Sequence, residues 1–157
     1  MNVASFNEIE DEFRRRVERI VWCNVATIDR RNRPRSRILH PLWEGPTGWI
    51  ATGRHSTKEK HLAHNRFVSL CYWDPQHQQI YAECTAEWAD DAPTKQRVWD
   101  LFKSTPPPMG YDLAMFWPGG PADPTCGILK LTPWRVELSA LADMMSGKPA
   151  LVWRRTE

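Results

Sequence analysis

Two β-type runs, RFVSLCYW at residues 66–73 and QQIYAECTAEWA at residues 78–89, are separated by only the four residues DPQH. Asp and Pro favour a tight turn. Antiparallel strands can be joined by so short a connection, whereas parallel strands need a crossover of a dozen or more residues. The spacing therefore predicts a β-hairpin in the middle of the chain and a fold built on an antiparallel sheet.

Other β-type runs repeat this arrangement. VWCNVATID at residues 21–29 is joined to an alternating run over 35–43 by RRNRP, in which Asn32 can take the left-handed backbone conformation. WIAT at 49–52 follows the turn EGPTG. Near the C-terminus, GILKL and WRVELSAL predict a last strand or strand pair, and PALVWR an additional edge. The total is about six strands.

Three short helices are expected between these strands. Apolar residues spaced by three and four positions predict an amphipathic helix over about residues 7–20. Ser56 and Glu59 have the spacing of a capping box, which predicts a helix that begins at Ser56 and ends near Asn65. A further helix begins at about Pro93 after Asp91 as its cap.

The region from about 104 to 124 holds six of the 13 prolines together with several large apolar residues. Such a composition predicts a long loop that is pinned to the surface of the fold rather than a free linker. We expect its aromatic residues Tyr111, Phe116 and Trp117 to form one wall of a substrate pocket.

Length and composition set the class of protein. A chain of 157 residues is expected to form one domain, over residues 1–157, with a single substantial core. Its formal net charge is only +2, so it is not a polycation that coats nucleic acid, and any positive site must be local. No apolar run approaches the roughly 20 residues that span a bilayer, and no signal peptide is evident. We expect a cytoplasmic protein whose four cysteines are buried thiols.

The predicted fold is mainly β with short helices (α+β), as a six-stranded antiparallel barrel. A small closed barrel is an economical way to remove the exposed edges of such a set of strands.

The segment TGRHSTK at residues 52–58 lies where a strand ends and a helix begins. Unpaired amides at a helix N-terminus carry a partial positive charge. Together with the hydroxyls of Ser56 and Thr57 and the ammonium group of Lys58, these amides could bind one anion, and a phosphate monoester fits best. The alternative is that Ser56 only caps the helix and Lys58 is solvated.

Arg37 favours the anion site. It lies inside a predicted strand between Ser36 and Ile38. An arginine that faces a barrel interior or a cleft needs an anionic partner, because an unpaired buried charge is costly. A phosphate would provide that partner.

Several of these residues, taken in their order along the chain, resemble a known family. Arg37-Ile38-Leu39, TGRHSTK, HLAHNRFVSL and Gln79 at the start of a strand that runs into AEW occur in the order seen in the pyridoxamine 5′-phosphate oxidase-like, FMN-binding split-barrel group. The resemblance covers roughly residues 10–138. It implies that the cofactor-binding residues are Arg37, Ile38, Leu39, Thr52, Ser56, Thr57, Lys58 and Gln79. Arg37 and Lys58 would hold the FMN phosphate with Ser56 and Thr57, and the others would lie near the flavin ring.

The resemblance also implies a homodimer with the cofactor in a groove between the subunits, and a flavin-dependent oxidoreductase that acts on a small molecule. Leu42 and Ser139 stand where pyridoxamine phosphate oxidases have a lysine and a tryptophan, and their C-terminal phosphate-binding cluster is absent. Pyridoxamine phosphate is therefore not the expected substrate, and catalytic residues stay unassigned.

Alternatives remain open at this stage. A deazaflavin such as F420 could replace FMN at the same anchor, and the protein could be a flavin or haem carrier without catalysis. A barrel that binds single-stranded nucleic acid is a third alternative, against which the near-neutral charge argues. His61 and His64 lack a third metal ligand and are expected at a surface or interface, so no metal site is predicted. His40 could meet the flavin or a substrate, or serve as a hydrogen-bonded structural residue.

Overall fold

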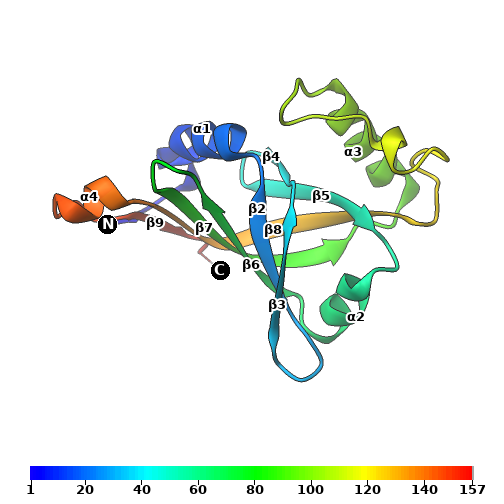
Figure 1. The fold of residues 1–157 in the computed structure, drawn as a ribbon, viewed down its shortest axis with the longest axis horizontal. Coiled ribbons are helices and arrows are strands. Elements are labelled where there is room, and N and C mark those ends of the chain that lie inside the picture. The colour runs from blue at the N-terminus through cyan, green and yellow to red at the C-terminus, as the bar shows by residue number, and fades with distance from the viewer. Residues whose placement is uncertain (157) are drawn as a thin grey trace.

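The structure is a computed structural model that describes residues 1–156 (Figure 1). Within this range all nine strands belong to one sheet. The strands are β1 Asn2–Val3, β2 Cys23–Ile28, β3 Pro34–Leu39, β4 Leu42–Glu44, β5 Thr47–Gly53, β6 Phe67–Trp73, β7 Gln78–Trp88, β8 Cys126–Ala140 and β9 Leu151–Arg154. The helices are α1 Glu10–Ile20, α2 Thr57–His64, α3 Ala92–Ser104 and α4 Leu141–Met145, with single 3-10 turns at Phe6–Glu8 and Leu113–Met115. The mainly β fold with short helices is the class that the sequence predicted.

The strand order is β1-β9-β8-β7-β6-β2-β3, and β8 also pairs with β5, which pairs with β4. Every pairing is antiparallel except that of β1 with β9. Strand β8 is 15 residues long, so its first half pairs with β5 and its second half with β9. The sheet is open, with β3 at one edge, which fits the split barrel that the resemblance implies and not the fully closed barrel expected from the strands alone.

The strand count rises from six to nine for identifiable reasons. The run over 35–43 divides at His40 and Pro41 into β3 and β4, because a proline has no N–H to continue the ladder. GILKL and WRVELSAL form the single strand β8, and the additional edge predicted at PALVWR forms β9. The short β1 pairs with β9 at the edge.

The expected turns and helix ends are largely confirmed. Asn32, in the turn between β2 and β3, has a φ of 57°, and His77, in the turn between β6 and β7, has a φ of 58°. Helix α2 is flanked by Ser56 and Asn65, as predicted. The carboxylate of Asp91 accepts a hydrogen bond from the backbone N–H of Thr94 at 2.9 Å and caps α3.

Two buried clusters hold the fold together. The first lies between α1 and the inner face of the sheet, where Phe13 and Val17 are each 1 % exposed. The second joins α3 and the segment after it to β5 and β8. Its buried members are Leu42, Trp49, Val98, Trp99, Phe102, Leu113, Cys126 and Ile128. Because Leu113 is fully buried, the proline-rich segment is pinned to the fold, as its composition predicted.

The opposite face of the sheet carries apolar side chains that are open to solvent. Ile38, Asn24, Cys71 and Tyr81 stand in one row across β3, β2, β6 and β7, so their side chains share a face. We call this the outer sheet face. Ile38 is 61 % exposed on it, and the β6 residues Phe67 and Trp73, which have the same parity as Cys71, are 51 % and 53 % exposed.

The four cysteines are free, and three of them are buried. No helix in the described range is long and apolar enough to cross a membrane.

Candidate functional site

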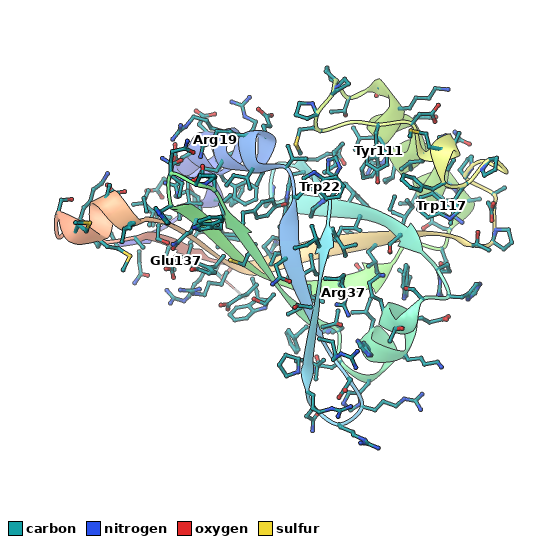
Figure 2. All side chains as sticks on the ribbon, in the orientation of Figure 1. Arg19, Trp22, Arg37, Tyr111, Trp117 and Glu137 are labelled. Atoms are coloured by element: carbon teal, nitrogen blue, oxygen red, sulfur yellow. The ribbon has the colours of Figure 1, made fainter. Side chains whose placement is uncertain are left out.

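Arg37 lies on β3 opposite Val25 of β2, whose side chain is buried in the core. The Arg37 side chain therefore points to the inner side of the sheet, toward α2 (Figure 2). Its Nη1 donates to the carbonyl oxygen of Val25 at 3.2 Å and to Oγ1 of Thr27 at 2.8 Å. Both acceptors are neutral. Burial lowers the pKa of Arg37, and repulsion from Arg35 lowers it further.

Lys58 occupies the first turn of α2 and is half-buried. Burial lowers the pKa of its ammonium group, and the positive charge of Arg37 lowers it further. The two cations are therefore within electrostatic reach of each other, although they are far apart in the sequence. None of the ion pairs formed within residues 1–156 includes either Arg37 or Lys58.

The neighbouring Arg54, in contrast to Arg37 and Lys58, has carboxylate partners. Its guanidinium pairs with Asp90 at 2.8 Å and with Glu59 at 2.7 Å, and it stacks over the ring of Trp88 at 4.6 Å. Its charge is thus neutralised within the chain. Among residues 1–156, Arg37 and Lys58 thus pair with no carboxylate, whereas Arg54 pairs with two, so the two cations could together hold an external anion.

The hydroxyl group of Ser56 lies at the start of α2. Its Oγ is buried and makes no hydrogen bond, and it does not cap the helix through its side chain. The predicted capping box with Glu59 is wrong, because the Glu59 carboxylate is turned toward Arg54. A buried hydroxyl without a partner is costly, and an anion at the N-terminus of α2 would provide the partner. We call Arg37, Lys58 and Ser56 the anion site. Thr57, the fourth residue predicted there, is the first residue of α2, and its side chain is exposed.

A hydrogen-bonded relay joins the anion site to the interior. Oγ1 of Thr27, which accepts from Arg37, lies 2.8 Å from Nδ1 of His61 on α2. His61 is only 5 % exposed, so the expectation of a surface position is wrong. Burial lowers the pKa of His61, and the charge of Arg37 lowers it further, which favours the neutral ring. This relay fixes the guanidinium of Arg37 relative to α2.

His64, the other histidine of α2, is exposed and contacts Oδ1 of Asn32 at 3.1 Å, so it does not join His61. Consistent with this separation, residues 1–156 contain no group of three or more His, Cys, Asp or Glu side chains placed to hold a metal ion.

A cavity of about 470 Å³ opens where β3 and β5 end. Ile38, Leu39 and Thr52, three of the predicted cofactor residues, line one part of it. The proline-rich segment supplies another part. Its contribution consists of Pro108, Tyr111, Met115, Phe116 and Trp117. The predicted wall is therefore present, and Trp22, Tyr111 and Trp117 lie on that side of the molecule (Figure 2).

His40 also lines the cavity and is 8 % exposed. Its ring stands between Trp22 and Tyr111, with centroids 5.0 and 5.1 Å away. The backbone of Met109 is a hydrogen-bond partner of the ring, while Nε2 is buried and has no partner within residues 1–156. Burial lowers the pKa of His40, so the imidazole is neutral at neutral pH.

Gln79 is not part of this assembly within one chain. It begins β7, which is separated from β3 by β6 and β2. Its Oε1 accepts hydrogen bonds from the hydroxyls of Ser139 at 3.0 Å and Tyr81 at 3.2 Å. It has the same parity as Tyr81 and therefore points to the outer sheet face.

The sequence reasoning missed Thr27 and placed His61 wrongly. Thr27 stands two residues after Val25 on β2, so the two side chains point to the same inward face. The alternation of inward and outward residues along this run could have identified Thr27 as an inward hydroxyl. The burial of His61 depends on α2 docking against β2, which no local pattern reveals.

Comparison with known proteins gives a consistent result. A family model described as pyridoxamine 5′-phosphate oxidase matches residues 9–140. Among curated proteins, none matches this chain.

Several crystal structures share the fold. A Clostridium acetobutylicum protein related to general stress protein 26 has a TM-score of 0.74 and 17 % identity, covering 96 % of both chains. A pyridoxamine 5′-phosphate oxidase-related, FMN-binding protein from Nostoc punctiforme has a TM-score of 0.65 and 16 % identity, covering 99 % of this chain and 98 % of its own. A NimC/NimA family protein from C. acetobutylicum has a TM-score of 0.68 and 15 % identity, covering 87 % of each chain. At these identities the structures establish the fold.

Proposed function

The chain belongs to the pyridoxamine 5′-phosphate oxidase family, and from this premise we propose that it is an FMN-binding oxidoreductase for a small molecule other than pyridoxamine phosphate. It would act as a single split-barrel domain over residues 1–157. The matching family model and the FMN-binding relative of the same fold support a flavin protein. A cytoplasmic location stays a prediction, which the four free thiols support.

One observation carries this proposal, namely the anion site. Within residues 1–156, Arg37 and Lys58 pair with no carboxylate although they lie within electrostatic reach of each other, and the hydroxyl of Ser56, two residues before Lys58, is buried without a hydrogen bond. A phosphate monoester has about −2 charge at neutral pH and three acceptor oxygens, so it can satisfy all three groups at once. The residues present therefore fit the phosphate end of FMN.

Three of the remaining predicted residues are placed to meet the rest of the cofactor. Ile38, Leu39 and Thr52 line the cavity next to the anion site on β3 and β5, where backbone groups of the edge strand β3 are available to a ring system. FMN when bound supplies hydride chemistry at its flavin ring, whereas the protein supplies position and electrostatics. In this arrangement Arg37 and Lys58 fix the tail of the cofactor, and Thr27 with His61 holds Arg37 in place.

The two departures from true pyridoxamine phosphate oxidases have structural counterparts. Leu42 is 3 % exposed and packs in the second buried cluster, so an apolar contact replaces a cation at this position. Ser139 is 6 % exposed and donates to Gln79, so it presents no ring to a substrate. These contacts support a different substrate.

The outer sheet face supports the homodimer. Ile38, Phe67 and Trp73 together form an exposed apolar set on it, which is typical of protein interfaces. Gln79 points to the same face, so it reaches a flavin only as Gln79 of the partner subunit. We expect the purified chain of 18.3 kDa to sediment as a dimer. A monomer at micromolar concentration would reject this interface.

The proposed function is tested on the purified protein by its visible absorption spectrum and by mass spectrometry of the compound that heating releases. We expect a yellow sample that releases about one FMN per chain, or an apoprotein that takes up FMN on addition. A colourless protein that takes up F420 or haem but not FMN would contradict the cofactor. Turnover of bound FMN when NADPH is added would indicate an enzyme, whereas the lack of turnover would indicate a carrier.

A further inference from the structure

The cavity has no charged lining. In the part of the chain that the structure describes, its lining includes no Asp, Glu, Lys or Arg. Burying an ionised group without a partner is strongly unfavourable. A ligand that carries a carboxylate, a phosphate or an ammonium group inside this cavity would therefore meet no opposite charge, and the cavity selects for an uncharged ligand.

The shape of the lining favours a flat ring. Tyr111 packs edge-on against Phe116 with centroids 6.2 Å apart, and Phe116 lies 5.8 Å from Trp117. Trp22 contributes a further ring from the junction of α1 and β2. Phe116 is 64 % exposed and Trp22 58 % exposed. Open aromatic surfaces around a cavity stack favourably with planar ligands.

His40 gives the cavity one directional group. Because the backbone of Met109 is a hydrogen-bond partner of the ring and Nε2 has none within residues 1–156, we assign the ring proton to Nδ1. In the neutral ring Nε2 then carries a lone pair and accepts a hydrogen bond. The ring of Trp22 lies 5.0 Å from that of His40 and is 58 % exposed, so a shift of this ring would open Nε2 to a ligand in the cavity.

We propose that the cavity binds an uncharged, planar ring compound that donates an O–H or N–H to Nε2 of His40, with phenols as the simplest members. This inference rests on the proposed function, since the ring compound would be the substrate held beside FMN. The isoalloxazine ring also carries one N–H, so the flavin itself is the second possible source of this donor. The test must separate the two sources.

The test measures by calorimetry how tightly the wild-type protein binds three naphthalenes of similar size. Each compound is measured with FMN bound and again after FMN has been removed. 2-Naphthol has the donor, 2-methoxynaphthalene lacks it, and 2-naphthoate is charged. We expect the FMN-bound protein to bind 2-naphthol about tenfold more tightly than the ether, the value of one buried hydrogen bond, and to bind the naphthoate most weakly. His40→Phe should remove the preference for naphthol, whereas the exposed His64→Phe should retain it.

The outcomes are distinct. Equal binding of naphthol and ether, or tightest binding of the naphthoate, would overturn the inference without any variant. Competition between naphthol and FMN would also overturn it, because His40 would then serve the flavin. If the protein fails to bind FMN but still binds the three compounds in the expected order, the proposed cofactor fails while the preference of the cavity stands.

Discussion

The variant Arg37→Ala with Lys58→Ala is expected to lose about a hundredfold in FMN affinity while its fold persists. A hydrogen bond to a charged group contributes about 1.5 to 3 kcal/mol, which corresponds to roughly ten- to 150-fold for each single variant. Because both cations would contact one phosphate, the losses need not add. Folding should not suffer, since neither side chain pairs with a carboxylate of residues 1–156 that the variant would leave unpaired.

The measurement is a titration of the apoprotein with FMN, followed by quenching of the flavin fluorescence. Lys60→Ala and Arg30→Ala are matched controls, because both residues are exposed cations near the same elements and should leave affinity within about twofold. Riboflavin, which lacks the phosphate, should bind the wild type and the double variant alike. An unchanged FMN affinity in the double variant would reject the anion site.

The same titration has a pH dependence whose sign follows from Lys58. Its pKa is lowered in the free protein by burial and by Arg37, so it loses its charge at a lower pH than an ordinary lysine. FMN affinity should therefore fall as pH rises through that lowered pKa, below 10.5. The single variant Lys58→Ala should lack this alkaline fall. An equal fall in that variant would assign it to another group.

The second large effect is on stability. Gly110→Ala is expected to cost about 3 kcal/mol of unfolding free energy, at the upper end of the usual range for overpacking. A Cβ at this position would stand 1.8 Å from the carbonyl oxygen of Thr105 and 2.6 Å from that of Phe102. Both are backbone atoms at the end of α3, so neither can rotate away, and the segment that lines the cavity must shift.

Urea unfolding of Gly110→Ala against Gly53→Ala measures this effect. A Cβ at Gly53 would meet its nearest atom, Cβ of Ser56, at an ordinary 3.8 Å, so this control should change stability by less than about 1 kcal/mol. Equal stability of the two variants would show that the segment after α3 can shift without a large cost in free energy, and would contradict the prediction. Because the segment carries Tyr111, the Gly110 variant should also lose its affinity for 2-naphthol.

Local chemistry predicted much of the architecture and part of the candidate site. Alternation and turn residues predicted the hairpin of β2 and β3, and the helix boundaries at Ser56 and Asn65 followed from their capping preferences. Arg37 could be singled out because a charged side chain on an inward strand position needs a partner. What the sequence could not show depends on contacts between distant elements. The open edge at β3 and the burial of His61 between α2 and β2 are of this kind.

The length of strand β8 affects how the protein unfolds. Leu131 and Val136 on it belong to the first buried cluster, and Cys126 and Ile128 to the second. One continuous backbone thus supports the layer beneath α1 and the layer beneath α3. Unfolding of either layer would release part of β8, on which the other layer depends. The chain should therefore lose the anion site and the aromatic cavity together, in one cooperative unfolding transition.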